Sequence, residues 1–128
     1  MTRRIVAALQ NPYVHILAHP TGRLWGEREP YEVDLDEVAA VAARTGTALE
    51  INAYTKRLDL NDAQAKRAHE LGALLVISTD THVLTQLDSF ELGLSMARRA
   101  WLTAGDVLNT RRVDDVLAWA RRKRARTR

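Results

Sequence analysis

The sequence predicts an α/β fold in which parallel strands alternate with helices. Three short apolar runs, near residues 14–18, 48–52 and 74–79, have the length and composition of buried strands. Segments with apolar residues at helical spacing separate them, as in β-α-β units with right-handed crossovers. Each run ends in a polar cluster, and in such folds the carboxyl ends of parallel strands carry the chemistry. We therefore expect the three polar clusters to share one edge of the sheet.

The amino-terminal part of the chain should contain a helix followed by a long loop. Residues 3–10 form the first expected helix, with Thr2 as its N-cap and Asn11-Pro12 as its stop. Beyond the first strand, the glycine- and proline-containing segment 21–33 is expected to be a loop.

The next two helices begin with residues of the kind that cap helix amino termini. Asp34 and Glu37 form a D-x-x-E pattern at the start of one helix, which Gly46 ends. Residues 61–64 begin the other helix, which ends at Gly72. Helical spacing predicts that each helix buries one face. The inward residues are Leu35, Val38, Ala39 and Ala42 in the first helix and Ala65, Ala68 and Leu71 in the second.

The carboxyl-terminal third should contain two further helices. Residues 88–91 are expected to cap the first, residues 103–108 to form a single turn, and the final helix to follow. Trp119 fits the core side of the final helix. The other inward residues are expected to be Phe90, Leu94, Ala97 and Trp101 in the first helix and Val113, Val116, Leu117 and Ala120 in the final one.

Composition limits the classes of protein. The chain has 128 residues, 46% hydrophobic and 27% charged, which fits one globular domain. It has no apolar stretch of about 20 residues that would cross a membrane and no signal peptide, so a cytoplasmic location is expected. There is no cysteine, and any metal must bind through nitrogen and oxygen ligands.

The positive charge is concentrated at the carboxyl end. Residues 121–128 contain six of the 19 basic residues and no acid, which leaves 13 basic against 16 acidic side chains in residues 1–120. Residues 1–120 are therefore expected to form the folded domain and residues 121–128 a basic tail. The tail either contacts nucleic acid phosphates or is a solvated helix end whose cations suit the helix dipole.

Two histidines and an aspartate form a candidate metal site. Asp80 and His82 are two residues apart at the end of a strand, so their side chains point to the same side. His19 ends the neighbouring run and is a third candidate ligand. Such a set with open positions suits Mn²⁺, Fe²⁺ or Zn²⁺. The alternative is that Asp80 caps the following segment and each histidine only forms hydrogen bonds.

Other polar residues near the strand ends have two interpretations each. Glu50, followed by Asn52, either supports a ligand histidine by a hydrogen bond or pairs with an arginine. Arg23 and Arg57 follow strand ends in loops and are candidates for binding phosphate, although loop arginines are often only solvated. Trp25 either lines a substrate cleft or fixes its loop to the body.

The remaining two histidines are expected to lie outside the metal site: His15 is either structural or at the opposite edge of the sheet, and His69 is structural. His15 lies four residues before His19, about 13 Å along an extended strand, and is too distant to bind the same ion. His69 falls in a helix that the pattern places on the surface.

Five strings, taken in order and spacing, resemble the PHP domain, most closely that of bacterial family X DNA polymerases. They are His-Pro-Thr-Gly-Arg (19–23), Leu-Glu-Ile-Asn (49–52), Arg-Leu-Asp-Leu (57–60), Ile-Ser-Thr-Asp-Thr-His (77–82) and Val-Leu-Asn-Thr (107–110). The resemblance covers nearly the whole chain. It implies a distorted, TIM-like (β/α)7 barrel that holds up to three ions, Mn²⁺ or Zn²⁺, and hydrolyses phosphoesters. Matching by motif, His19, Asp80 and His82 take the places of the family's later ligands.

The chain departs from this family at its beginning. The early H-x-H ligands of the family have no counterpart, so the resemblance implies the carboxyl-terminal half of a barrel. It also implies a manganese-dependent 3′–5′ exonuclease in the intact protein, with DNA as substrate and little activity of this chain alone. The alternatives are a small-molecule phosphatase of the histidinol-phosphatase type and a non-catalytic barrel remnant. If the chain is half of a barrel, its sheet is expected to be completed by the missing half or by a homo-oligomer.

Overall fold

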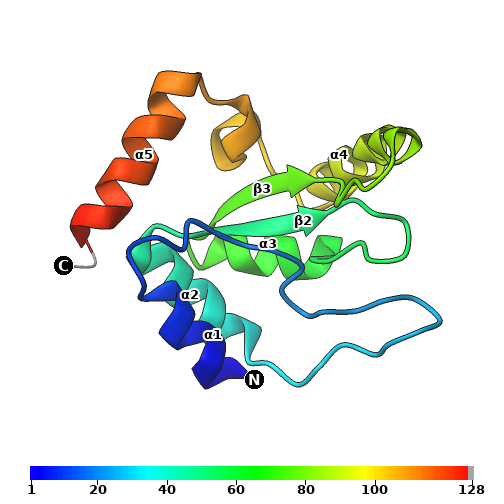
Figure 1. Cartoon of the computed structure of the whole chain (residues 1–128), viewed down its shortest axis with the longest axis horizontal. Coiled ribbons are helices and arrows are strands. Elements are labelled where there is room, and N and C mark those ends of the chain that lie inside the picture. The colour runs from blue at the N-terminus through cyan, green and yellow to red at the C-terminus, as the bar shows by residue number, and fades with distance from the viewer. Residues whose placement is uncertain (127–128) are drawn as a thin grey trace.

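The computed structural model describes the backbone of residues 1–126 and the side chains of residues 1–123. Helices and strands alternate along the chain (Figure 1), and 3-10 turns occupy 84–89, 104–106 and 108–110. The elements are α1 (Thr2–Leu9), β1 (Ile16–Leu17), α2 (Leu35–Thr45), β2 (Ala48–Asn52), α3 (Asp62–Glu70), β3 (Leu74–Ser78), α4 (Phe90–Arg99) and α5 (Val113–Arg126).

The three strands form one open parallel sheet in the order β1-β2-β3. This confirms the α/β class and is consistent with part of a barrel. The first strand is shorter than expected, because only Ile16 and Leu17 pair with β2 and the chain turns away at His19, whose φ is +30°. None of the helices in the described part of the chain has the length and apolarity needed to cross a bilayer.

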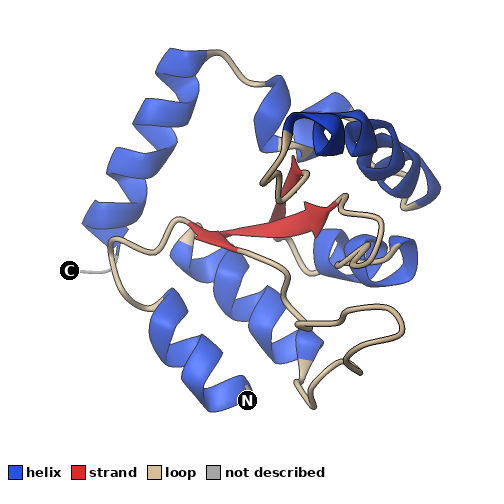
Figure 2. Ribbon diagram, turned by 45° about the vertical axis from the view of Figure 1, so that its right-hand side comes forward, coloured by secondary structure: helices blue, strands red, loops and turns tan. Residues whose placement is uncertain are grey.

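Alternate side chains of the strands enter two different apolar clusters. Leu49 and Ile51 of β2 face the larger cluster with α1 to α4, and Ala48 faces a smaller one that contains Trp119 of α5. Figures 1 and 2 show α2 and α3 along one side of the sheet and α5 near the beginning of the strands. The carboxyl half of the second face is polar, since Glu50 and Asn52 follow Ala48 at intervals of two.

The outer edge of β3 is closed by the 107–110 string. Leu75 forms a parallel bridge with Val107. The Asn109 side chain then takes the place of a neighbouring strand, because its Oδ1 accepts the Ile77 N–H at 2.8 Å and its Nδ2 donates to the Ile77 carbonyl at 2.9 Å. On the opposite side, the structure pairs β1 with β2 and with no other strand of residues 1–126. The sheet can therefore be extended beyond β1.

The expected caps of α2 and α3 are confirmed. The Asp34 carboxylate accepts the Glu37 N–H at 3.0 Å, Gly46 ends α2 with φ +75°, and Asn61 and Gln64 form a capping box. The N-cap of α1 is Met1 and not Thr2, because the Thr2 hydroxyl instead accepts the Asp34 N–H at 2.9 Å.

One expectation for α4 was confirmed in part and another was wrong. A 3-10 turn, residues 84–89, precedes α4. The N-cap of α4 is Ser89, within the expected segment 88–91, but the Ser89 side chain makes no capping bond. Trp101 is not in the core. It follows the end of α4 with φ +61° and is 79% exposed, because the helix ends before completing the turn that would bury it.

The final helix is turned differently from the expected pattern and is longer. Val113 and Leu117 are exposed, whereas Trp119 is buried and donates its Nε1–H to the Gly46 carbonyl at 2.9 Å. The helix continues past residue 120, and Lys123 is buried. The basic side chains of Arg124, Arg126 and Arg128, counted in the expected tail, lie outside the described residues.

Candidate functional site

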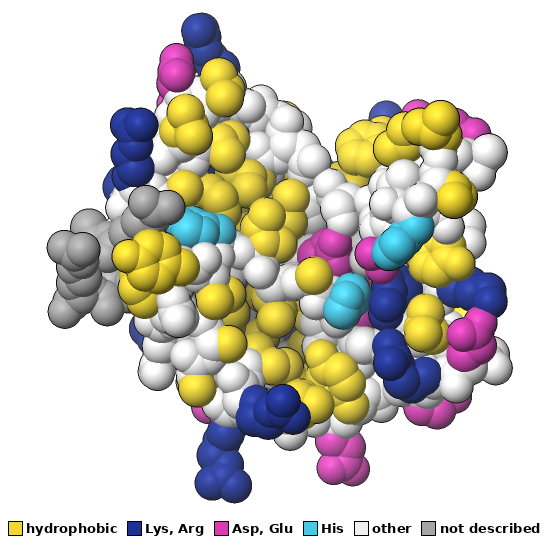
Figure 3. Space-filling model, viewed as in Figure 1, with side chains coloured by type: hydrophobic (Ala, Val, Ile, Leu, Met, Phe, Trp, Pro, Cys, Tyr) yellow, Lys and Arg dark blue, Asp and Glu magenta, His cyan; other side chains and the backbone are white. Residues whose placement is uncertain are grey.

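The polar endings of the three strands do meet at one edge of the sheet. His19 follows β1, Asn52 ends β2, and Asp80 and His82 follow β3. Because the strands are parallel and in register, from Ile16 beside Ala48 to Asn52 beside Ser78, their carboxyl ends lie side by side. Figure 3 shows two histidines among acidic and basic side chains on one side of the molecule.

Glu50 ties the three strand ends together. Its carboxylate accepts the backbone N–H of His19 at 2.5 Å, Nδ2 of Asn52 at 3.1 Å and the hydroxyl of Ser78. The side chain is buried and bonds to no arginine among the described residues. Glu50 thus contacts the backbone of His19, not its imidazole, and fixes where the chain leaves β1.

Asn52 is fully buried beside Glu50. Its Nδ2 donates to Glu50, and its Oδ1 accepts the N–H of Tyr54 at 3.0 Å. The amide therefore orients the carboxylate and starts the turn that follows β2. Support of a metal ligand by Glu50 and Asn52 remains a prediction.

Asp80 is paired with an arginine. Nε of Arg57 lies 3.0 Å from Oδ2 of Asp80, and the two side chains are only 13% and 26% exposed. His82 lies nearby with Nδ1 2.7 Å from the Asp80 carbonyl oxygen, so Nδ1 carries the proton of that bond and Nε2 is the nitrogen left for another partner.

The predicted donors do not form a complete metal site in this chain. Within residues 1–123, no three histidine, aspartate or glutamate side chains are arranged to hold an ion. Nitrogen and carboxylate donors are of the right chemical type for Mn²⁺ or Zn²⁺. However, one oxygen of Asp80 is bonded to a guanidinium. His19, Asp80 and His82 therefore lie at one edge of the sheet but do not form a coordination sphere.

Asp59 is a site residue that sequence reasoning missed. Its fully buried carboxylate accepts the backbone N–H groups of Thr21 and Gly22, each at 3.0 Å, and so fixes the turn after His19. Burial, the largest influence, raises the pKa of Asp59, while the bonds from Thr21 and Gly22 oppose that rise. The sequence did contain a signal for this role, because Asp59 stands between Leu58 and Leu60. A carboxylate between two apolar residues is costly to bury unless it accepts hydrogen bonds.

The stability difference between the wild type and Asp59→Asn is expected to depend on pH. The pKa of Asp59 in the folded protein is raised above its ordinary value of 3.8. The folded protein therefore keeps the Asp59 proton at pH values where the unfolded chain has lost it. The stability that this retained proton contributes is complete below the pKa of Asp59 in the unfolded chain, and it is lost as pH rises through the pKa in the folded protein. Urea unfolding of both proteins over a pH series should therefore show the wild type losing stability relative to the variant as pH rises.

Asp36→Asn is the matched control for that series. Its hydrogen bond with Arg67 lowers the pKa of the exposed Asp36, so any contribution has the opposite sign and is lost as pH falls. A pH-independent difference between wild type and Asp59→Asn would contradict the account of Asp59.

Arg23 and Arg57 bind each other's loops. Arg23 donates from Nε and Nη2 to the Arg57 carbonyl, at 2.9 and 2.7 Å, and from Nη2 to the Leu58 carbonyl at 2.5 Å. Arg57 returns a bond from Nη1 to the Arg23 carbonyl at 3.3 Å. Both guanidinium groups lie beside the strand ends, and phosphate binding by them remains a prediction.

The other two histidines lie away from this cluster. His15 is close to Trp119 and Ala120 of α5, with Nε2 3.2 Å from the Ala120 carbonyl oxygen. His69 is on α3 as expected, and its Nδ1 lies 3.6 Å from a carboxylate oxygen of Asp106.

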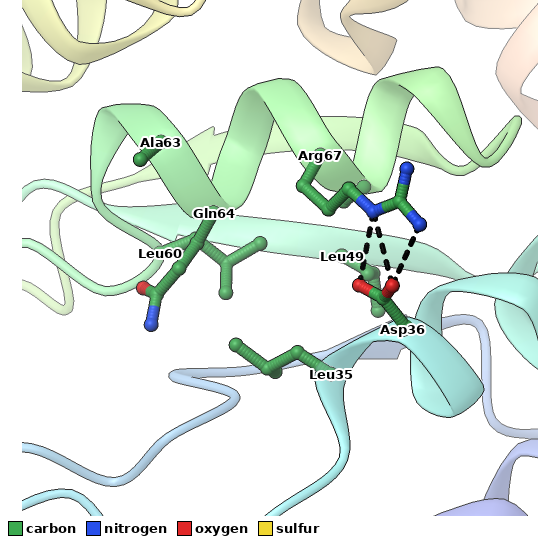
Figure 4. Close-up of a pocket in the computed structure, with 8 residues that line it drawn as sticks. Leu35, Asp36, Leu49, Leu60, Ala63, Gln64 and Arg67 are labelled. Atoms are coloured by element: carbon green, nitrogen blue, oxygen red, sulfur yellow. Dashed lines mark hydrogen bonds and ion pairs between the residues drawn. The ribbon is translucent and has the colours of Figure 1, made fainter.

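A cavity of about 240 Å³ lies between α2 and α3 (Figure 4). Arg67 bonds the Asp36 carboxylate at its rim, and the interior is mainly apolar. None of the predicted site residues lines it. The lining residues are Leu35, Asp36, Leu49, Leu60, Ala63, Gln64, Arg67 and Ala68.

Similarity to known proteins identifies the class. No protein-family model matches the chain. It is 30% identical over 115 residues to a probable phosphatase of Thermoanaerobacter sp. (strain X514), covering 85% of this chain and 44% of that protein. It is 35% identical over 101 residues to one of Shewanella sp. (strain ANA-3), covering 74% and 38%. The chain is homologous to these PHP-family probable phosphatases, as its motifs indicate.

A stronger match is to a DNA polymerase. The chain is 45% identical over 120 residues to the DNA polymerase/3′-5′ exonuclease PolX of Bacillus subtilis (strain 168). The alignment covers 94% of this chain and 21% of that protein, in its carboxyl-terminal region. The chain thus spans about a fifth of PolX and less than half of the two phosphatases.

Proposed function

We propose that this chain is the carboxyl-terminal part of a PHP phosphoesterase domain. In the intact protein this domain acts as a manganese-dependent 3′–5′ exonuclease on DNA ends, attached to a family X DNA polymerase. The observation that carries the proposal is the 45% identity to a protein named for polymerase and 3′-5′ exonuclease activities, over an alignment that covers 94% of the chain. The polar strand endings that carry the motifs also gather at one edge of the sheet.

Within the proposed function, the residues at the strand ends have separate roles. His19, Asp80 and His82 contribute to a site for Mn²⁺ or Zn²⁺, and the remaining ligands come from the part of the domain that this chain does not span. Arg57, already beside Asp80, and Arg23 hold the substrate phosphate. Glu50 and Asn52 fix the strand ends from behind. The chain alone, without a three-donor group among its described residues, then has little or no activity.

Two further proposals concern partners. The edge of β1 and the polar face of the sheet are completed by the missing part of the barrel or by a second copy of the chain. In this proposal residues 1–120 belong to the PHP domain, and Arg121 and Arg122, which are exposed on α5, contact DNA phosphates. A cytoplasmic location fits such a partner.

Two alternatives have an observation in their favour. Similarity to proteins named probable phosphatases favours a small phosphomonoester as substrate. The lack of a three-donor group in residues 1–123 favours a non-catalytic module. The latter predicts that Mn²⁺ leaves the melting temperatures of the wild type and His82→Ala equally unchanged.

The test is a comparison of substrates with the intact gene product. We expect Mn²⁺-dependent release of nucleotides from the 3′ end of single-stranded DNA, weak hydrolysis of p-nitrophenyl phosphate, and a loss of DNA turnover of about 100-fold in Asp80→Asn. His69→Ala, which changes a histidine on α3, should keep full activity. Preferential hydrolysis of the small ester would support the phosphatase alternative, and no hydrolysis of either would leave the non-catalytic one.

A further inference from the structure

Trp25 is a large aromatic residue that the proposed chemistry does not use. Its side chain is 57% exposed, in the loop that follows the turn after His19. Exposed tryptophans near a site often contact a ligand, since the ring offers a large apolar face. A neighbouring side chain and the surrounding backbone fix the position of Trp25.

The guanidinium of Arg23 supports the indole. Its central carbon lies 4.6 Å from the ring centroid, in the range of a cation–π contact. Arg23 cannot move freely, because its three hydrogen bonds to the carbonyls of Arg57 and Leu58 fix the guanidinium. One side of the indole is thus covered by a fixed cation, while more than half of the side chain remains in solvent.

The backbone around Trp25 is also fixed. The Trp25 N–H donates to the Lys56 carbonyl at 2.7 Å, which joins this loop to the loop after β2. Leu24 and Arg28 exchange two backbone bonds, at 2.9 and 2.8 Å, and close the turn that presents the ring. The indole is therefore ordered before any ligand arrives, which reduces the entropic cost of binding.

Two contacts connect this ring to the strand-end cluster. The Arg23 carbonyl accepts Nη1 of Arg57, and Nε of Arg57 bonds Asp80. The two loops, residues 21–28 and 54–60, contain four basic and two acidic residues, and one of those acids is the buried Asp59. Figure 3 shows basic side chains beside the histidines. A negatively charged chain lying along this edge would pass both the cluster and the indole.

We propose that Trp25 is a stacking platform for a nucleobase of single-stranded nucleic acid whose phosphate lies beside Arg57 and Asp80. Every base has a π face, so such a platform binds without regard to sequence, and the loop cations attract the backbone. This deepens the proposed function, on which the identity of the substrate rests. Stacking on Trp25 would also make the site bind a polynucleotide end more tightly than a small phosphomonoester, which has no base.

The test measures binding to the full chain without requiring catalysis. A short fluorescent oligothymidylate and a matched abasic oligomer, which has the phosphates and lacks the bases, are titrated and followed by anisotropy. We expect the wild type to prefer the base-containing oligomer. Trp25→Ala should weaken its binding about tenfold and leave the abasic oligomer unaffected, while Trp25→Phe retains part of the preference.

Trp101→Ala is the matched control, because Trp101 is more exposed, at 79%, but has no cation over its ring among the described residues. It should bind both oligomers as the wild type does. Equal binding of the two oligomers by the wild type, equal losses on both in Trp25→Ala, or the same loss in Trp101→Ala would overturn the proposal. A Trp25-dependent preference in a protein that hydrolyses no ester would refute the proposed exonuclease and leave this inference standing.

Discussion

Replacing Lys123 by alanine is expected to lower the free energy of unfolding by about 3 kcal/mol. Lys123 is 1% exposed, and its Nζ donates to the Leu9 carbonyl at 2.9 Å and to the Thr47 hydroxyl at 2.8 Å, with the Thr45 carbonyl at 3.4 Å. The amine thus joins α5 to the ends of α1 and α2. Alanine would leave these oxygens without their donor and open a cavity where the alkyl stem packs.

Urea denaturation of three variants separates the two causes. Lys123→Met keeps most of the packing volume and removes the donor, so its loss should be smaller, about 1–2 kcal/mol. Burial lowers the pKa of Lys123, because a charge is less stable inside the protein than in water, and methionine carries no charge. Arg122→Ala, an exposed position on the same helix, should change stability by less than about 0.5 kcal/mol. Equal stability of Lys123→Ala and Arg122→Ala would show that α5 is not held by this residue.

Replacing Arg57 by methionine is expected to destabilise the protein by about 2 kcal/mol and to strengthen its interaction with Mn²⁺. The substitution leaves the three-quarters-buried Asp80 carboxylate without its cation and removes a bond to the Arg23 carbonyl. In the proposed metal site, the Arg57 guanidinium and a metal ion would compete for the Asp80 carboxylate. Thermal unfolding with and without MnCl₂ should therefore show a larger stabilisation by Mn²⁺ in the variant than in the wild type.

Arg67→Met is the control for that experiment. Arg67 pairs with Asp36 through short bonds, but both side chains are about half exposed and lie on α3 and α2. Its removal should cost about 0.5 kcal/mol and leave the response to Mn²⁺ unchanged. A response in Arg57→Met that equals those of Arg67→Met and the wild type would mean that the guanidinium does not compete for Asp80.

Local signals in the sequence were sufficient where the determining contacts are local. The caps at Asp34 and Asn61 and the stop at Gly46 involve neighbours within a few residues, and the structure confirms all three. The N-cap at Thr2 was wrong because its hydroxyl bonds the distant Asp34. Trp101 was placed in the core because helical spacing assumes that the helix continues, and α4 ends at Arg99.

Some features of the candidate site could likewise be predicted from the sequence, and others could not. The meeting of the strand endings at one edge followed from the expectation that the strands are parallel. The roles of Asp59 and Asn109 did not, because each depends on a backbone segment more than 30 residues away along the chain. The pairing of Arg57 with Asp80 likewise joins two loops that no sequence spacing connects.

The sequence by itself determined the α/β class, the order of strands and helices along the chain, and the homology to PolX and to PHP-family probable phosphatases. Periodicity, caps and ordered motifs are properties of short segments. Only the tertiary structure decided which charges meet, which cation enters the interior at Lys123, and which tryptophan is held against an arginine. The physical reason is that hydrogen bonds and ion pairs act over a few ångströms in space, and only the folded backbone sets those distances.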